Sequence, residues 1–334
     1  MEKKDMILEL EHLYVRYETE DGIVNAVNGV SIRLEKGKTL GVVGETGAGK
    51  TTTARSIMRL IPVPPGVIEA EKIVVDGVDI KSLSPQKLEQ VRGKDVSMIF
   101  QDPMTALNPV LSVGEQIAES IELHEHLGKK EAYEKARQML ELVGIPGSRA
   151  VEYPHQFSGG MKQRVVIAIA LACNPKLLIA DEPTTALDVT IQAQVLDLMK
   201  RLKEQYETSM ILITHDLGIV AEVCDEVIVM YAGRIVEQGT LEQVFNHTRH
   251  PYTEGLFGSL PNINDRKTML KPIPGLMPDP TDLPEGCSFS PRCPYATERC
   301  KKQKPRLKYV GEHWVECLRY DEENFSIERK VIND

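Results

Sequence analysis

The stretch Gly44-Glu-Thr-Gly-Ala-Gly-Lys-Thr51 decides the fold, because it has the complete G-x-x-x-x-G-K-[ST] spacing of a phosphate-binding loop. Its glycines let the backbone curl until successive N–H groups face phosphate oxygens. An apolar run, residues 39–43, precedes the loop, and residues 51–60 have helical spacing after it. A strand, a glycine-rich loop and a helix in this order predict a triphosphate site at the start of that helix.

Two side chains of this loop have distinct expected roles. Lys50 should reach the β- and γ-phosphates of ATP, and the Thr51 hydroxyl should bind Mg²⁺. A chance glycine-rich turn is the alternative, and the flanking strand and helix make it the weaker one. The residues expected to contact the nucleotide here are Gly44, Glu45, Thr46, Gly47, Ala48, Gly49, Lys50, Thr51 and Thr52.

A second apolar run, residues 177–180, ends in the adjacent carboxylates Asp181 and Glu182. The run predicts a buried strand that brings both carboxylates to the metal side of the site. We expect Asp181 to hold Mg²⁺ through water and Glu182 to act as the general base on the attacking water. Such a strand end is often structural when it stands alone, but its combination with the phosphate loop favours the functional interpretation.

The rest of the chain predicts an α/β fold. Short alternating strands are expected over residues 7–43 and again at 73–80, and residues 113–143 are mostly helical and polar-faced. From Ser158 onward, helical and strand patterns alternate, which predicts a largely parallel sheet covered by helices. After about residue 250 the chain is proline-rich and loses its periodicity, so we expect an irregular extension.

Two further features lie near predicted element ends. Ser158-Gly-Gly precedes a helix and forms a possible second anion-binding element, although a capped helix start would look the same. His215 follows the strand expected at 210–214. A lone histidine after a strand is usually structural, but this one could contact the γ-phosphate side of the same sheet edge.

Composition excludes several classes of protein. The net charge of −9 over 334 residues argues against a free nucleic-acid binder, which usually shows a basic footprint. Residues 1–11 lack the apolar core of a signal peptide, and no run approaches the roughly 18 apolar residues of a membrane span. We therefore expect a cytosolic chain whose role at a membrane, if any, comes through a partner.

In this order the motifs resemble the ATP-binding subunit of an ABC transporter, over roughly residues 7–250. Phe157-Ser-Gly-Gly-Met161 is similar to the family signature L-S-G-G-Q and departs from it at Phe157 and Met161. The resemblance implies that Ser158, Gly159 and Gly160 bind ATP held by a partner subunit. Two loops would thus make one site across a dimer.

The resemblance also implies roles for residues outside these motifs. Gln101, in Phe100-Gln-Asp-Pro103, resembles the loop that senses Mg²⁺ and contacts the membrane partner. Ala186-Leu-Asp188 resembles the loop that links the two sites, and His215 the switch histidine. Tyr17 is the expected adenine-stacking residue, with Tyr14 as the alternative. Tyr17 and Asp188 thus join the implied nucleotide contacts. Gln101 and His215 join Glu182 as implied catalytic residues. Gln101 also joins Thr51 and Asp181 as an implied Mg²⁺ ligand.

Residues 100–109 and 250–256 resemble the oligopeptide/dipeptide importer branch of this family. That branch implies an ATPase that energises peptide import from the cytoplasmic face of the membrane, as a peripheral subunit. Its implied partners are a paralogous ATPase subunit, two membrane permease subunits and, indirectly, an extracytoplasmic peptide-binding protein, with no nucleic acid.

The resemblance divides the chain into two parts. An ABC ATPase domain would span residues 1–250, with an antiparallel β subdomain. A helical subdomain at about 102–165 would carry the signature at its end. Residues 251–334 would form an irregular, cysteine-rich extension with a metal or cluster site.

Four cysteines crowd that extension: Cys287, Cys293, Cys300 and Cys317. Their spacing is not the C-x₂-C of zinc ribbons, and thiolates on irregular, proline-rich backbone suit an iron–sulfur cluster. Similar tails in this branch are associated with a [4Fe–4S] cluster. Zinc and unligated thiols remain open, since four sulfur ligands suit both metals. A structural role of the cluster is favoured, because a tail with so few periodic apolar residues needs a cross-link to hold its fold.

Three other functions compete with peptide import. An ABC ATPase acting on DNA or ribosomes is disfavoured, because no heptad run separates Lys50 from Phe157 and the chain has one cassette. A different transporter branch is a second alternative. A regulator that only binds ATP is the third, and Asp181, Glu182 and His215 argue against it.

Overall fold

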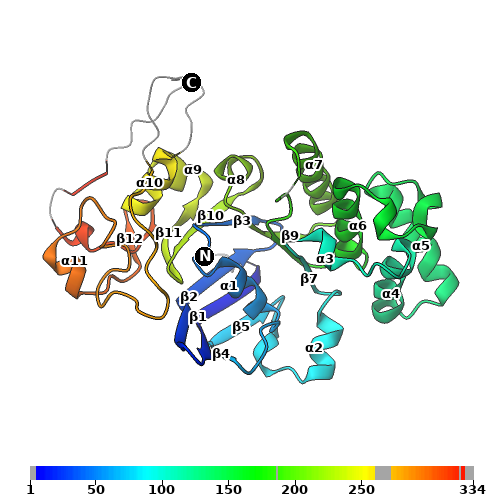
Figure 1. Cartoon of the computed structure of the whole chain (residues 1–334), viewed down its shortest axis with the longest axis horizontal. Coiled ribbons are helices and arrows are strands. Elements are labelled where there is room, and N and C mark those ends of the chain that lie inside the picture. The colour runs from blue at the N-terminus through cyan, green and yellow to red at the C-terminus, as the bar shows by residue number, and fades with distance from the viewer. Residues whose placement is uncertain (1–4, 186, 260–271, 323–324, 328–334) are drawn as a thin grey trace.

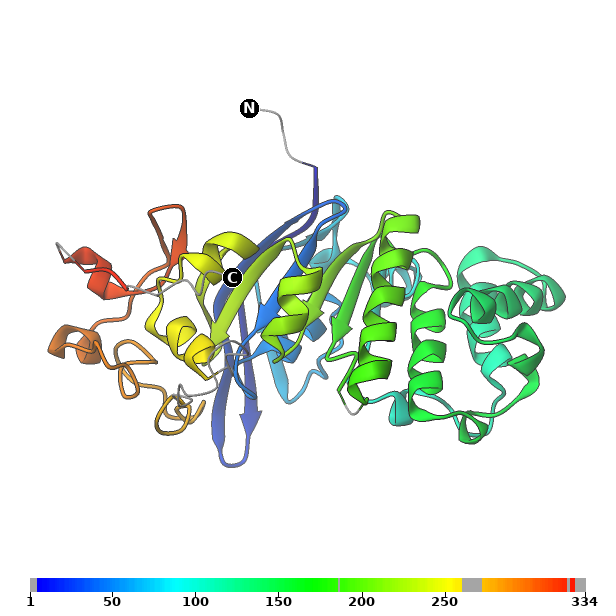
Figure 2. The same cartoon turned by 90° about the horizontal axis from the view of Figure 1, so that it is seen from above.

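The computed structural model describes residues 5–185, 187–259, 272–322 and 325–327. In this part of the chain, two β-sheets form the centre of the molecule and a lobe of helices lies to one side (Figure 1). The turned view shows the same lateral lobe and, at the opposite end, the C-terminal region (Figure 2). The molecule is therefore elongated, with the sheets between two outer parts.

The smaller sheet is antiparallel and is built on two 14-residue strands. Its path runs β2-β1-β5-β6, with β4 also paired to β1. The predicted short strands over residues 7–43 are thus two long strands and a third short one. Irregular register between Leu10 and Leu13 interrupts the alternation, which explains the broken pattern in the sequence. The strands are β1 (Met6–Thr19), β2 (Gly22–Glu35), β4 (Gly66–Glu69), β5 (Lys72–Val75) and β6 (Val78–Asp79).

The larger sheet is mixed, in the order β12-β13-β11-β10-β3-β9-β8-β7. Strands β10, β3, β9, β8 and β7 are parallel, as the alternation of helix and strand predicted. Their residues are almost all buried, which is expected for a parallel sheet covered on both faces. The strands are β3 (Thr39–Val43), β7 (Val96–Ile99), β8 (Leu177–Asp181), β9 (Ser209–Ile213), β10 (Glu226–Tyr231), β11 (Arg234–Thr240), β12 (Lys308–Val310) and β13 (His313–Val315).

The helical lobe occupies the region where helices were predicted. Its main helix α4 begins at a capping box, in which Ser112 and Glu115 each satisfy a backbone N–H of the other. Buried aliphatic side chains of α4, α5 and α6 belong to one hydrophobic cluster that continues beneath the larger sheet. The lobe contains α3 (Pro103–Ala106), α4 (Val113–Glu125), α5 (Lys129–Leu142) and the start of α6 (Gly159–Leu171).

The remaining helices cover the sheets or lie in the C-terminal region. They are α1 (Lys50–Ile57), α2 (Pro85–Val91), α7 (Val189–Gln205), α8 (Leu217–Val223), α9 (Leu241–Asn246), α10 (Pro251–Gly258) and α11 (Glu298–Lys302). No helix in the described ranges is long and apolar enough to cross a membrane.

The region after residue 250 is less irregular than the sequence predicted. Besides α10 and α11, it contains the hairpin β12–β13, and β13 pairs with β11 so that Glu237 lies opposite Val315. The C-terminal region therefore extends the larger sheet. Strands of three residues are too short to leave a period in the sequence, which is why the hairpin was missed.

Candidate active site

Four adjacent parallel strands bring the predicted motifs together. In the order β3-β9-β8-β7, their carboxyl ends meet at one edge of the larger sheet. The loop Gly44–Thr51 follows β3, His215 follows β9, Glu182 follows β8 and Gln101 follows β7. Ligands of open α/β sheets bind at this edge, so the topology itself gathers residues that are far apart in the sequence.

A cavity of about 500 Å³ lies at this edge and is lined by seven of the fourteen predicted nucleotide contacts. The phosphate loop and the start of α1 form one side, and the residues after β7, β8 and β9 form another. Strands β1 and β2 and a residue of the C-terminal region close the rest. The lining residues are Tyr17, Val24, Ala26, Thr46, Gly47, Gly49, Lys50, Thr51, Thr52, Gln101, Glu182, His215 and Pro280.

The phosphate loop is curled tightly, and glycine is required at two of its positions. Gly44 has φ of 150°, and a Cβ there would lie 2.2 Å from the carbonyl oxygen of Met230. Gly49, with φ of 96°, caps α1. The Lys50 ammonium donates to the carbonyl oxygens of Gly44 (2.7 Å) and Glu45 (3.0 Å). Burial lowers the pKa of Lys50, opposed by the nearby carboxylates.

Thr51 and Asp181 form the candidate magnesium pair. The Thr51 hydroxyl donates to Asp181 Oδ1 at 3.0 Å. Asp181 is 1% exposed, and burial raises its pKa, against the effect of the Thr51 hydrogen bond. A buried carboxylate beside a hydroxyl oxygen is a hard oxygen donor set that suits Mg²⁺. The residues present therefore fit this ion.

Glu182 is the centre of a small polar cluster. Its Oε2 accepts from Gln101 Nε2 and from Thr185 Oγ1, both at 2.9 Å, and its Oε1 lies 3.5 Å from His215 Nδ1. The Glu182 backbone has φ of 47°, a left-handed conformation that is strained for glutamate. The cluster can hold and polarise a water molecule next to the phosphate loop.

Tyr17, and not Tyr14, lines the cavity. Both tyrosines are on β1, where Tyr17 pairs with Val24 of β2 at the mouth of the cavity. Tyr14 packs its hydroxyl against Gly29 instead. The residue predicted to stack on adenine, Tyr17, therefore lies at the cavity, whereas Tyr14 does not.

The signature lies apart from this cavity. Ser158 caps α6, accepting from the Met161 N–H, and neither Ser158, Gly159 nor Gly160 lines the cavity. Helix α6 belongs to the lateral lobe, whereas α1 lies beside the antiparallel sheet (Figure 1). Asp188 caps α7. Ala186, also in that predicted linking loop, is outside the described residues. The chain thus does not bring its own signature to its own phosphate loop.

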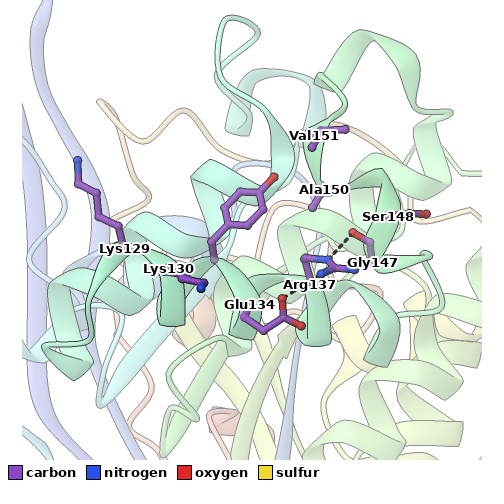
Figure 3. A pocket seen from close by; sticks show the side chains of 9 residues that line it. Lys129, Lys130, Glu134, Arg137, Gly147, Ser148, Ala150 and Val151 are labelled. Carbon is purple, nitrogen blue, oxygen red and sulfur yellow. Dashed lines mark hydrogen bonds and ion pairs between the residues drawn. The ribbon is translucent and has the colours of Figure 1, made fainter.

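A second hollow, of about 580 Å³, lies on the helical lobe between α5 and the short 3-10 helix Gly147–Val151 (Figure 3). Figure 3 shows basic side chains and Glu134 around it, with Arg137 reaching the Gly147 carbonyl. None of the predicted motif residues lines it, so we do not assign the nucleotide there. Its lining residues are Lys129, Lys130, Tyr133, Glu134, Arg137, Gly147, Ser148, Ala150 and Val151.

The predicted metal site of the C-terminal region is not supported. The N–H of Cys287 donates to the Cys300 carbonyl at 2.8 Å, yet within the described ranges no three His, Cys, Asp or Glu side chains are arranged to hold a metal ion. Burial raises the pKa of Cys287 to about 11 and that of Cys293 to about 12. As neutral thiols, these two pack against the hydrophobic cluster. The four tail cysteines, which include Cys317, are free thiols.

Sequence reasoning missed several residues of the site. Val24, Ala26 and Pro280 line the cavity, and Thr185 holds Glu182. Thr185 could have been found, because it lies three residues after the predicted general base. Pro280 carried no signal, because its place depends on contacts with residues about 250 positions earlier in the chain.

Comparison with known proteins identifies the class. The family "ABC transporter" matches residues 27–185, and the family "Oligopeptide/dipeptide transporter, C-terminal region" matches residues 236–300. The chain belongs to the ABC transporter ATP-binding proteins and hydrolyses ATP, as the motifs predicted. Its C-terminal region belongs to the second family, so the predicted branch is also confirmed.

Individual relatives cover nearly the whole chain. The oligopeptide transport ATP-binding protein OppD of Bacillus subtilis is 51% identical, covering 92% of this chain and 87% of OppD. The dipeptide transport ATP-binding protein DppD of the same organism is 48% identical, covering 95% and 96%. Among solved structures, the ATP-binding cassette MJ0796, a dimer bound to ADP and Pi, matches with a TM-score of 0.63 at 26% identity, covering 70% of this chain and 98% of the cassette. The predicted ABC ATPase fold is thereby confirmed.

Proposed function

We propose that this chain is the ATPase subunit that energises import of dipeptides and oligopeptides through a membrane permease. The match of residues 236–300 to the C-terminal region of oligopeptide/dipeptide transporters carries this proposal. Relatives named for oligopeptide and dipeptide transport support it, because they are 51% and 48% identical to this chain over most of its length. Uptake of labelled peptides should be ATP-dependent in proteoliposomes that contain the permease and this chain. Uptake of another solute class, but not of peptides, would assign the chain to a different branch.

The geometry supports a separate role for each site residue around the γ-phosphate of ATP. Lys50 binds the β- and γ-phosphates after leaving the loop carbonyls that it now contacts. Thr51 and Asp181 would hold Mg²⁺, which would neutralise charge on the phosphates. Glu182 takes the proton of the attacking water, and ADP is the leaving group. Gln101 and His215 orient Glu182 and report the state of the site.

The site is completed by a second subunit. The signature residues Ser158, Gly159 and Gly160 lie outside the cavity of their own chain, so they are free to contact ATP on a partner. A dimer with membrane permease partners is the expected arrangement for an ABC ATPase. The finer proposal is a heterodimer with a paralogous ATPase subunit, bound beneath two permease subunits at the cytoplasmic face and fed by an extracytoplasmic peptide-binding protein. Asp188 and its loop would join the two sites.

An incomplete site predicts weak hydrolysis by the isolated chain. ATPase turnover per chain should rise with protein concentration, and adding the paralogous subunit should raise it roughly a hundredfold, because the partner's signature supplies missing charge stabilisation. Steady-state phosphate release over a dilution series measures both effects. A brisk turnover rate that does not change on dilution would contradict the shared site.

The division of the chain stays part of the proposal: residues 1–250 form the ATPase domain, with its helical subdomain at about 102–165, and residues 251–334 form the extension. We retain a [4Fe–4S] cluster, with zinc as the alternative, on the four tail thiols. The Cys287 N–H donates to the Cys300 carbonyl at 2.8 Å, which supports the proposal because it places two of the four cysteines next to each other.

Anaerobic purification tests the cluster. We expect iron and acid-labile sulfide in equal amounts, and their loss in Cys300→Ser. Cys224→Ser is the matched control, because this buried cysteine lies outside the tail and should leave the iron content unchanged. Stoichiometric zinc without sulfide would favour the alternative. Thiols that bind neither metal would remove the site.

A further inference from the structure

A buried arginine of the C-terminal region reaches the phosphate loop. Arg292 Nη1 lies 2.9 Å from Glu45 Oε2, and the Arg292 side chain is 6% exposed. Its Nε donates to the Pro274 carbonyl at 3.0 Å. Nη1 also lies 3.4 Å from the hydroxyl of Tyr231, which ends β10. One guanidinium thus ties together the phosphate loop, the core sheet and the backbone of the C-terminal region.

The backbone that Arg292 holds continues into the nucleotide cavity. We call residues 273–280 the strap. Along it, the Met277 methyl group lies against Gly47 of the phosphate loop, at 2.9 Å from where a Cβ would stand. At its end, Pro280 lines the cavity, and its carbonyl accepts from the Asn25 N–H at 2.9 Å.

The strap borders the cavity beside β2, the strand that pairs with the Tyr17 segment of β1. Asn25 lies on β2 between Val24 and Ala26, which both line the cavity, and Val24 pairs with Tyr17. Tyr17 is the residue that we expect to stack on the nucleobase. Pro280 is therefore beside the nucleobase end, whereas Arg292 acts at the phosphate loop.

Glu45 is anchored from the C-terminal side at its backbone as well. Its N–H donates to the Tyr252 hydroxyl at 2.9 Å, so this loop position is held by α10 and by Arg292 together. A buried arginine that loses its carboxylate partner keeps an uncompensated charge, which is costly. The Glu45–Arg292 ion pair therefore constrains the conformation of the phosphate loop. ATP itself does not make this contact.

We propose that the C-terminal region is part of the nucleotide site: the strap forms the wall at the nucleobase end, and Arg292 is a positioning residue that fixes both the strap and the phosphate loop. The inference rests on the proposed assignment of ATP to this cavity. It gives the C-terminal region a role in ATP affinity that is independent of any metal bound by its cysteines.

Equilibrium binding of ATP and of inorganic tripolyphosphate to the full chain separates the two contacts. Arg292→Gln should weaken ATP binding roughly tenfold, the loss expected for one charge-assisted contact, and should weaken tripolyphosphate binding as well. Glu45→Gln should weaken both ligands to a similar extent. If the residues act as a pair, the double variant loses no more than either single variant. Pro280→Gly should weaken ATP alone, because tripolyphosphate has no nucleobase.

Two control variants make the outcome decisive. Arg299→Gln removes an exposed ion pair to Asp321 in the same region and should bind ATP normally. Lys50→Ala tests the assigned cavity itself. Normal ATP binding by Arg292→Gln, Glu45→Gln and Pro280→Gly, with binding lost in Lys50→Ala, would overturn this inference alone. Normal binding by Lys50→Ala would overturn the assignment of the cavity. If Arg292→Gln does not fold, Glu45→Gln decides, because Glu45 is the more exposed member of the pair.

Discussion

Replacing Glu182 by glutamine is expected to leave ATP binding nearly intact and to slow hydrolysis by at least about a hundredfold, the usual contribution of a general base. Glu182 contacts Gln101 and Thr185 and lies near His215, and no hydrogen bond joins its side chain to Lys50 or Thr51. The ATP contacts of Lys50 and Thr51 should therefore be retained in the variant. Glutamine has the same size and still accepts a hydrogen bond, but it cannot take a proton from water.

Single-turnover phosphate release measures the loss, with the partner subunit present so that the shared site is complete. ATP affinity is measured on the same preparation, so that a binding defect is not mistaken for a chemical one. Glu204→Gln, on the exposed side of α7, is the matched control and should hydrolyse ATP normally. Near-normal hydrolysis by Glu182→Gln would assign the base to another residue.

The left-handed backbone at Glu182 sharpens this expectation. A φ of 47° is costly for glutamate, and the Glu182 N–H donates to the Ile213 carbonyl of β9, which holds the strained conformation in place. The side chain is thus aimed by the sheet rather than by the nucleotide. The backbone of the Glu182→Gln variant should keep this conformation. The native and variant side chains should therefore differ in chemistry and hardly in position.

The part of the site that could be predicted from sequence is the part encoded locally. The phosphate loop, the acidic pair and His215 each follow a short apolar strand, and parallel strands end at one edge of a sheet. Order along the chain therefore implies closeness in space. Gln101 is different, because only the resemblance to a known family marked it, and the structure places it 2.9 Å from Glu182.

The contribution of the C-terminal region could not be predicted in this way. Glu45 and Arg292 are 247 positions apart, and the strap is a proline-rich segment without a period. Its contacts join residues that are far apart in the chain, such as Pro280 and Asn25, and no local pattern reports them. The cluster on the four cysteines of the C-terminal region stays a prediction: clustering in sequence suggested convergent ligands, whereas in the described residues Cys287 and Cys293 pack against apolar side chains and no three metal-ligating side chains converge.

Replacing Lys50 by alanine is expected to weaken ATP binding by roughly a hundredfold, as the loss of two hydrogen bonds from a charged group implies. Lys50 is 7% exposed, and its ammonium lies among the loop carbonyls and the carboxylates of Asp181 and Glu182. When ATP enters, the same ammonium can turn from these carbonyls to the phosphates. Alanine removes that cation and leaves the negative charges beside the phosphates uncompensated.

Titration with a fluorescent ATP analogue measures the affinity, and thermal unfolding without nucleotide shows whether the variant is folded. Lys50→Met is the matched variant: it keeps an apolar side chain of similar length, so a similar loss of affinity in both variants assigns the effect to the charge. ATP affinity within twofold of normal in a folded Lys50→Ala would assign the triphosphate to another site.

The two variants are informative together, because Glu182→Gln should accumulate the ATP-bound dimer and Lys50→Ala should prevent its formation. If both variants lost only turnover, the separation of binding at α1 from chemistry after β8 would be wrong.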